Sequence, residues 1–388
     1  MKIAFVSEHE IDKILPFSGI PYFMAKALRA EVDRFHFVKA PMFDLELMFS
    51  NPQRGWVQIE QIGKFVSDRL RQLQIDCVIC QGSSMIPFLD TRACICLWHD
   101  STWQTLMQIP FEEFHVNYPL LYEWDKAVLN KSSIIVYAAE WVREETISNY
   151  CVDPAILKVL PFGASVFDID EDFVERTISA RKRSPCQVTF IGVDWIRKGL
   201  PLAYSLMKRL NFIGLPTILN VIGCSFETAG ADGGLTKPWH SPHSPFTSGG
   251  LLLLRMRTDR FVKIWGFLDK DNEFEYKQFC EILGNTHFLI HPADFECFGV
   301  VLVEANAFGV PVLSLGKFGP RSIVKSGING HLFEPNQFID KALTHIASRL
   351  NDYDIYCSEC RNSFVEYRVR LNWDTNCRSL LSLISDFI

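Results

Sequence analysis

The chain has 388 residues, of which 48% are hydrophobic and 22% are charged, and its net charge is -6. Its length exceeds one ordinary core, so we expect two domains, and the composition is that of a globular protein. The negative charge argues against nucleic acid as the main partner, and no apolar run reaches the ~18 residues that cross a bilayer. The first residues lack a cleavable apolar region, so we expect a cytoplasmic protein with at most peripheral membrane contact.

Strands and helices alternate over the first part of the chain. The expected strands are Lys2–Val6, Asp76–Cys80, Ala93–Trp98, Ile134–Tyr137 and Leu157–Leu160. The expected helices are Tyr22–Ala30, Ile59–Leu73, Tyr118–Asn130 and Glu140–Asn149. Continuous apolar strands are typical of a parallel sheet covered on both faces, so the pattern predicts a doubly wound α/β domain over residues 1–165.

Two loops of this first domain carry candidate ligand-binding residues. Ser18 and Gly19 stand between the first strand and the first helix, where a glycine lets the backbone approach a ligand closely. The region has no GxGxxG pattern, so it is not a dinucleotide fingerprint. His99 and Asp100 follow a strand at its carboxyl edge, and His99 is a candidate hydrogen-bonding residue, although a lone histidine is more often structural.

Twelve cysteines raise the question of disulfides or a metal site. Cys77 and Cys80 lie three apart in one expected strand, and residues three apart point to opposite faces of a strand. A shared metal ion is therefore disfavoured. We expect reduced, buried thiols that pack as small hydrophobic side chains.

A second α/β series follows residues 166–185, a charged segment that we expect to be a linker or a connecting helix. Its expected strands are Gln187–Ile191, Pro216–Ile222, Val262–Trp265, His287–His291, Pro311–Leu315 and Gly330–Phe333. Its expected helices are Leu200–Leu210, Glu273–Leu283, Val303–Phe308 and Phe338–Asn351. This pattern predicts a second doubly wound domain over residues 186–365, followed at residues 366–388 by an amphipathic helix.

One segment of the second domain, Ser225–Arg260, is rich in Gly, Ser, Pro and Thr and carries no periodic pattern. A structureless loop of this length is unusual inside a compact domain. Two interpretations stay open, a surface insertion and a lid or partner-docking loop. The sequence does not decide between them.

A basic loop follows the first strand of the second domain. Gly192 ends the strand, Arg197 and Lys198 stand in the loop, and a helix is expected to begin near Leu200. Arginine can bind two phosphate oxygens at once, lysine adds a compact charge, and a helix N-terminus favours anions. The loop suits a phosphate group, although a solvated helix start with two cations would have the same sequence.

An acidic segment, His291–Val312, contains two carboxylates, Glu296 and Glu304. A helix is expected to begin near Phe298, and Gly299 would let its first amides approach a ligand. One carboxylate would lie in the loop and the other one to two turns into the helix. Carboxylates are natural acceptors for paired sugar hydroxyls, so both could face a polyhydroxylated ligand.

The acidic segment resembles the glutamate-x7-glutamate motif of the retaining family-4 (group 1) glycosyltransferases. The resemblance implies the GT-B fold, in which two Rossmann-like domains face each other across a cleft. It implies that residues 1–165 form the acceptor side and residues 186–365 the nucleotide-sugar donor side. In that family a C-terminal helix such as residues 366–388 packs back on the first domain.

The same resemblance assigns roles to the donor-side residues. Glu296 and the amides of Phe298, Gly299 and Val300 would hold the transferred sugar, and Glu304 would hold the ribose hydroxyls of the nucleotide.

The basic loop is similar to the family's diphosphate-binding loop. Arg197 and Lys198 would hold the diphosphate, although many members carry an arginine where this chain has Val193. The adjacent arginine and lysine resemble those of a bacterial subgroup.

For the remaining candidates the resemblance implies contacts with other parts of the substrates. His99 would contact the transferred sugar or the acceptor, Gly19 would approach the donor, and Phe267 would lie near the base. Three Asp-x-Asp triplets begin at Asp168, Asp269 and Asp352, but their linker, turn and tail contexts disfavour a catalytic metal, so we expect none.

The function implied is metal-independent transfer of a hexose from a nucleotide-diphospho-sugar, UDP- or GDP-linked, to a hydroxyl group with retention of configuration. The acceptor would be a sugar, a lipid-linked or a small molecule. No other cofactor is expected. The same fold also serves phosphorylases and sugar-nucleotide epimerases, and a non-catalytic nucleotide-sugar-binding protein is a further alternative. The base, the sugar and the acceptor are not identified by the sequence.

Overall fold

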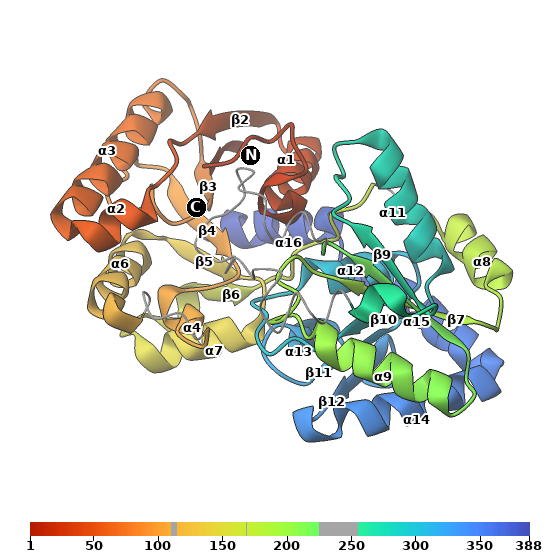
Figure 1. Ribbon diagram of the computed structural model, residues 1–388. Helices are drawn as coiled ribbons and strands as arrows, with labels where there is room; N and C mark the ends of the chain where they lie inside the picture. Colours follow the sequence, from red (N-terminus) through yellow and green to blue (C-terminus); the bar gives the residue numbers. More distant parts are fainter. Residues whose placement is uncertain (110–114, 168, 225–254) are drawn as a thin grey trace. The chain divides into compact units, whose positions relative to one another are not determined.

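The computed structural model describes residues 1–109, 115–167, 169–224 and 255–388. The chain divides into two compact units (Figure 1): unit 1 is Met1–Ser165 with Arg370–Ile388, and unit 2 is Val166–Val369. Each unit is built on one six-stranded sheet in which all paired strands run parallel. The predicted α/β class with two doubly wound sheets is confirmed.

The sheet of unit 1 has the order β2-β1-β3-β4-β5-β6. Its strands are β1 (Lys2–Ser7), β2 (Arg34–Lys39), β3 (Cys77–Gln81), β4 (Cys94–His99), β5 (Ile134–Tyr137) and β6 (Leu157–Val159). The helices of this unit are η1 (Pro16–Gly19), α1 (Ile20–Glu31), α2 (Leu45–Ser50), α3 (Pro52–Leu70), α4 (Trp103–Leu106), α6 (Tyr118–Lys131), α7 (Glu140–Asn149), η2 (Pro154–Ile156) and α16 (Trp373–Ser385). Helix α16 packs against α1, so the last residues of the chain belong to the first unit.

Strand β2 was not predicted from the sequence. It lies at the edge of the sheet, pairs only with β1, and buries just one of its six side chains, Val38. An edge strand with charged residues at both ends has no continuous apolar run, so it lacks the signal by which the other strands of this sheet were recognised.

The sheet of unit 2 has the order β12-β11-β10-β7-β8-β9. Its strands are β7 (Cys186–Ile191), β8 (Thr217–Ile222), β9 (Val262–Gly266), β10 (Phe288–His291), β11 (Val312–Leu315) and β12 (Gly330–Phe333). Its helices are α8 (Glu171–Ala180), α9 (Leu200–Phe212), α11 (Glu273–Asn285), α12 (Val300–Ala307), α13 (Pro320–Ile323), η3 (Pro335–Gln337), α14 (Phe338–Asn351) and α15 (Tyr353–Arg370). The segment expected to be a linker or a connecting helix contains a helix, α8.

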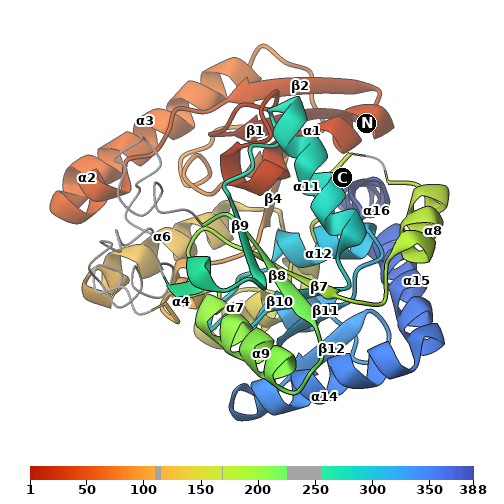
Figure 2. The same ribbon diagram turned by 45° about the vertical axis from the view of Figure 1, so that its right-hand side comes forward.

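The strand order of unit 2 determines which face each helix covers. From β7 the chain adds β8 and β9 on one side of that strand. It then crosses back and adds β10, β11 and β12 on the other side. Because such crossovers are right-handed, the connecting helices α9 and α11 lie on opposite faces (Figure 2). The order reverses between β7 and β10, and ligands in open α/β sheets bind beyond the carboxyl ends of strands at such a switch point.

All twelve cysteines are free thiols, and most are buried or half-buried. Cys77 and Cys80 of β3 are fully buried in the core of unit 1. Packing as small hydrophobic side chains, as predicted, accounts for them.

The helices of the described part of the chain include none that is both long and apolar enough to cross a bilayer. Most of the Ser225–Arg260 insertion, residues 225–254, lies outside the described residues. The two interpretations of that insertion therefore stay open.

Candidate functional site

The loops that follow β7 and β10 lie against each other at the switch point of unit 2. Gly199, the N-cap of α9, has a left-handed φ of 83°, and a Cβ there would lie 2.1 Å from the carbonyl oxygen of Pro292. The amide of Asp294 donates to the carbonyl of Arg197 at 3.0 Å. Only a glycine therefore fits where the loop after β7 crosses the loop after β10.

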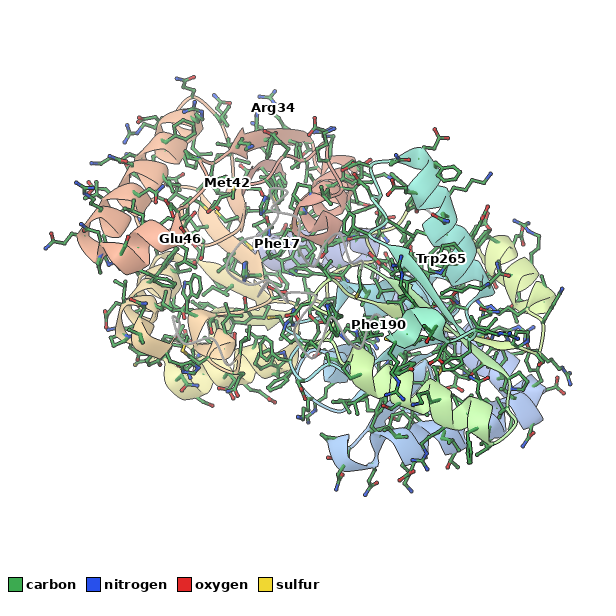
Figure 3. The ribbon with its side chains drawn as sticks, viewed as in Figure 1. Phe17, Arg34, Met42, Glu46, Phe190 and Trp265 are labelled. Carbon is green, nitrogen blue, oxygen red and sulfur yellow. The ribbon has the colours of Figure 1, made fainter. Side chains whose placement is uncertain are left out.

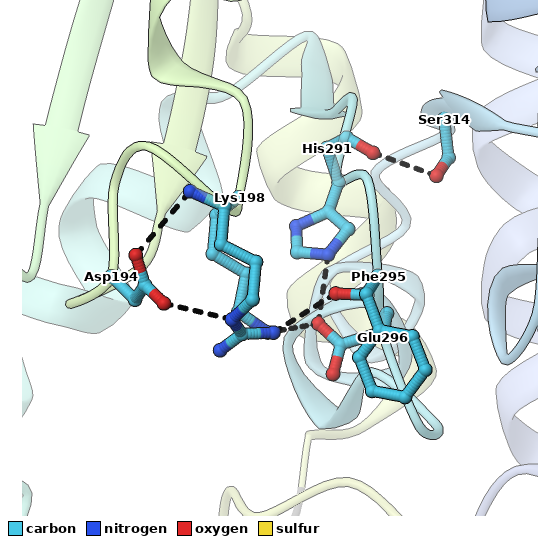
Figure 4. Close-up of polar contacts among 7 residues, drawn as sticks. Asp194, Lys198, His291, Phe295, Glu296 and Ser314 are labelled. Atoms are coloured by element: carbon cyan, nitrogen blue, oxygen red, sulfur yellow. Dashed lines mark hydrogen bonds and ion pairs between the residues drawn. The ribbon is translucent and has the colours of Figure 1, made fainter. Parts of the chain in front are cut away.

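Lys198 and Glu296 come from these two loops and form an ion pair (Figure 4). His291, the last residue of β10, also binds Glu296, with its Nε2 2.9 Å from Oε2 of the carboxylate. Only 16% of the Lys198 side chain and 12% of the Glu296 side chain are exposed, and His291 is fully buried. The structure thus brings together two predicted site residues that are 98 positions apart.

The charge state of this cluster follows from its contacts. Burial alone would raise the pKa of Glu296, but the Lys198 charge and the hydrogen bond from His291 outweigh it and hold that pKa well below its usual range. Burial lowers the pKa of His291, so its imidazole is neutral at physiological pH. A neutral imidazole that faces an ionised carboxylate carries its hydrogen on Nε2 and donates it.

Arg197 is held beside this cluster by two contacts. Its Nε donates to Oδ2 of Asp194 at 2.8 Å, and its Nη1 donates to the carbonyl oxygen of Phe295 at 2.9 Å (Figure 4). Within the described residues, Nη2 has no partner. The guanidinium is therefore fixed in orientation but keeps a donor for an anion.

The start of α12 supplies backbone amides next to Glu296. Gly299 is the N-cap, with a φ of 102°, and Val300 is the first helical residue, so the helix begins two residues later than predicted. Phe298 is buried and fixes the turn, and a Cβ on Gly299 would lie 3.2 Å from Cγ of Glu296. The Glu296 side chain therefore passes close to Gly299. The amides at the start of α12 that have no helical partner can donate to a ligand.

Glu304 lies further along α12 and is 1% exposed. Its carboxylate pairs with Lys270, which stands in the loop after β9 and also lies over the ring of Phe279 at 4.5 Å. Burial raises the pKa of Glu304, and the Lys270 charge offsets only part of that effect. Glu304 therefore does not share the ion pair of Lys198 but has a cation of its own.

Phe267 directly follows β9, and 40% of it is exposed. Nearby, the amide of Gly223 donates to the carbonyl of Gly266 at 2.7 Å, and a Cβ on Gly223 would clash with the backbone of Gly192. The carboxyl ends of β7, β8 and β9 thus approach closely beside Phe267.

Gly19 and His99 belong to unit 1, so their sharing of a site with the residues of unit 2 stays a prediction. Gly19 caps α1 with a φ of 82°, and Phe17 and Ser18 before it have φ values of 50° and 57°. The Phe17 ring (Figure 3) lies 6.1 Å from the ring of His99. Nδ1 of His99 lies 3.0 Å from the carbonyl oxygen of Ser101 and 3.2 Å from its amide nitrogen, so this ring atom is held by the loop after β4.

Three functional residues were missed by the sequence analysis: His291, Asp194 and Lys270. Each acts through a predicted site residue, by binding Glu296, Arg197 or Glu304. The sequence carried no signal for them: a buried carboxylate such as Glu304 is rarely left without a cation, but its burial is known only from the structure. No spacing rule singles out Lys270 among the other lysines.

The Asp-x-Asp triplets have structural explanations where the structure describes them. Oδ1 of Asp269 accepts from the amide of Asp271 at 2.9 Å, and Oδ1 of Asp352 accepts from the amide of Ile355 at 3.2 Å. Asp168 lies outside the described residues. The expectation that no metal takes part in catalysis stays a prediction.

Comparison with known proteins shows that part of unit 2 is similar to one family. Residues 267–368 match the family model for glycosyl transferases group 1. A segment of 95 residues is 36% identical to sucrose-phosphate synthase 4 of Arabidopsis thaliana, and it covers 24% of this chain and 9% of that relative. The sucrose synthase of Denitrovibrio acetiphilus is 28% identical over 96 residues, 24% of this chain and 12% of that relative. The chain thus matches only a small part of these relatives' own length.

Solved structures resemble the whole chain. HepE of Anabaena, in complex with UDP-glucose, has a TM-score of 0.66 at 14% identity and full coverage of both chains. Sucrose-phosphate synthase from Thermosynechococcus elongatus has a TM-score of 0.71 at 14% identity, with 100% of this chain and 99% of that chain covered. WaaG, a glycosyltransferase involved in lipopolysaccharide biosynthesis, has a TM-score of 0.64 at 15% identity and 99% coverage of each.

At these identities the structural likeness establishes the fold, and the family match lies within unit 2. Residues 267–368 are thus similar to the group 1 glycosyltransferases, and the chain has the two-domain GT-B fold of the solved structures.

Proposed function

We propose that this protein is a retaining glycosyltransferase that moves a hexose from a nucleotide-diphospho-sugar to an acceptor hydroxyl without a metal ion. The observation that carries the proposal is the contact between Lys198 and Glu296 at the switch point of unit 2. A cation suited to a diphosphate thus lies beside an ionised carboxylate suited to sugar hydroxyls, which supports the proposal. UDP is the nucleotide we favour, because the structurally similar HepE forms complexes with UDP and UDP-glucose.

In the proposed reaction the bond between the sugar C1 and the diphosphate oxygen breaks, and the acceptor oxygen bonds to C1 on the same face. The acceptor proton passes to the departing phosphate, and the products are the glycoside and the nucleoside diphosphate. Lys198, Nη2 of Arg197 and the amides at the start of α12 would stabilise the charge that develops on the leaving group. Glu304 would hold the ribose, and Glu296 the hexose.

On the acceptor side we propose that His99 contacts the transferred sugar or the acceptor through Nε2. Gly19 would let the loop before α1 approach the donor, and Phe267 would lie near the base. These three roles follow from the family resemblance; in the structure His99 ends β4, Phe267 follows β9 and Gly19 caps α1.

The Lys198→Ala variant tests the proposal directly. Loss of one preorganised cation at a developing oxyanion should lower kcat by about 100- to 1,000-fold. The measurement is UDP release from UDP-hexoses with a panel of sugar acceptors. Lys208→Ala, an exposed lysine further along α9, is the matched control and should keep wild-type rates.

Two outcomes would overturn the assignment. Wild-type turnover in Lys198→Ala would remove Lys198 from the reaction. Release of a hexose phosphate when inorganic phosphate is supplied, in place of UDP release to an acceptor, would identify a phosphorylase.

A further inference from the structure

A pocket lies in unit 2 near the start of β7, whereas the Lys198 loop follows the end of that strand. Its volume is about 400 Å³, which is enough for one small ligand. Its lining comes from the segment before β7, from the inner parts of β8 and β9, and from one side of α11. Gln187 lies near the start of β7, whereas the proposed donor site follows the end of that strand, so the two sites are separate.

A chain of side-chain hydrogen bonds fixes the wall of this pocket. The indole Nε1 of Trp265, on β9 (Figure 3), donates to Oδ1 of Asn220 at 3.1 Å. Nδ2 of Asn220 then donates to Oε1 of Gln187 at 3.1 Å. Asn220 is 5% exposed, so the chain is anchored in the sheet and holds the half-buried indole in one orientation. Within the described residues the Nε2 donors of Gln187 remain unused.

The remaining polar groups favour an anion. Lys182 and Lys263 line the pocket from two different segments, and both are exposed. In the part of the chain that the structure describes, neither lysine forms an ion pair. Glu281 is the one carboxylate of the lining. Two lysines without partners leave the pocket with an excess of positive charge and of hydrogen-bond donors.

We infer that this pocket binds the anionic unit of a sugar, with a phosphate or carboxylate group at Lys182 and Lys263 and the ring packed against Trp265. An indole face pairs with the apolar face of a pyranose ring, and Gln187 and Glu281 supply a donor and an acceptor for its hydroxyls. The inference is independent of the proposed transferase reaction. It gives this protein a second carbohydrate site at the start of β7, whereas the proposed donor site follows the end of that strand.

Calorimetric titration of the intact protein tests the inference. Glucose 6-phosphate and glucuronate are the two probes, because they carry the phosphate and the carboxylate on the same ring, and glucose is the neutral reference. Saturating UDP is added in every titration to occupy the donor site. We expect at least one anionic probe to bind about tenfold or more tightly than glucose.

Variants locate that binding. The double variant Lys182→Gln, Lys263→Gln should weaken it about tenfold or more, and Trp265→Ala should weaken it as well. Lys277→Gln replaces an exposed lysine of α11 outside the lining and should leave it unchanged. Thermal unfolding midpoints verify that the variants are folded, and UDP affinity should be the same in all of them.

The inference is wrong if neither anionic probe binds at millimolar concentration, or if a bound probe has the same affinity for the double lysine variant as for the wild type. A probe that loses affinity equally in the Lys277→Gln control would also overturn it, because binding would then reflect net charge alone.

Discussion

Lys198 and Glu296 neutralise each other, and this pairing determines how the two residues would respond to a donor. A diphosphate carries more negative charge than one carboxylate, so it would draw the ammonium of Lys198 toward itself. Glu296 would then keep only His291 as its partner and gain free acceptor positions for sugar hydroxyls. Binding of the diphosphate would thereby prepare the carboxylate for the sugar.

Removal of Lys270 should destabilise the folded protein, because this lysine is the cation paired with buried Glu304. Lys270→Met leaves the carboxylate of Glu304 buried without its cation, and breaking one side of a buried ion pair costs about 3 kcal/mol or more. Urea unfolding would measure the loss. The matched control is Lys277→Met, an exposed lysine on α11, which should change the unfolding free energy by less than about 0.5 kcal/mol.

The same variant predicts a pH dependence. The pKa of Glu304 is already raised in the folded protein above its ordinary value of 4.5, and loss of Lys270 raises it further. The folded state then binds more protons than the unfolded state, so stability falls as pH rises from 4.5 through the folded pKa. The loss of unfolding free energy caused by Lys270→Met should thus be small near pH 4.5 and grow toward neutral pH. A cost independent of pH would show that Glu304 does not cause it.

At the residue scale the sequence singled out candidate ligand-binding residues but not the residues that support them. Lys198 and Glu296 were both identified from their motifs, and they do meet. His291 and Lys270, which hold the two glutamates, carry no pattern that separates them from other polar residues. Such supports are chosen by three-dimensional proximity, which spacing along the chain does not reveal.

At the element scale, the close contact at Gly199 holds the loop of Arg197 and Lys198 against the loop of Glu296. Gly199→Ala would bring a Cβ to 2.1 Å from the Pro292 carbonyl and also strain a φ of 83°. We expect a stability loss of several kcal/mol and weaker UDP binding, because the loops must separate. Urea unfolding and calorimetry would measure the two effects.

Gly214 provides the matched control for that prediction. It has a similar φ of 81°, but no atom lies within 4 Å of the position of an added Cβ. Gly214→Ala should therefore lower the unfolding free energy only by the cost of the left-handed backbone, about 1–2 kcal/mol, and leave the UDP affinity unchanged. Equal losses in the two variants would mean that the loop crossing does not support the site.

The elements themselves were largely predictable because their apolar patterns are continuous. The strands around the switch point, β7 and β10, are fully buried or nearly so, and the sequence identified both. Edge strand β2 lacks that pattern and was missed. The start of α12 was placed two residues too early, because a glycine at an N-cap and a glycine inside the preceding turn look alike in sequence.

At the scale of the whole molecule, the chain leaves unit 1 near Ser165 and returns to it at Arg370. Trp373, at the start of α16, is 5% exposed and packs on Trp98 and Phe162, with ring centroids 5.7 and 5.6 Å apart. A Cβ on Gly163 would collide with the Trp373 backbone, so the contact is close. The sequence predicted a terminal helix here, but not which side chains hold it.

Trp373→Ala should therefore destabilise unit 1 by about 3–5 kcal/mol and leave UDP binding by unit 2 intact. Hydrogen exchange would show faster opening of β4 and α1, with unit 2 amides unchanged, and calorimetry would give the UDP affinity. Faster exchange spread evenly over β7 and β10 would contradict the assignment of α16 to unit 1.

Our central claim is that Lys198 and Glu296 together form a donor site. In it, Lys198 serves both the diphosphate of the donor and the carboxylate of Glu296. Calorimetric titration of wild type, Lys198→Ala and Glu296→Gln with UDP and with UDP-glucose tests it most directly. We predict that Lys198→Ala weakens both ligands, whereas Glu296→Gln binds UDP at least as tightly as wild type but loses the additional affinity that the glucose contributes. Wild-type affinities for both ligands in both variants would contradict the claim.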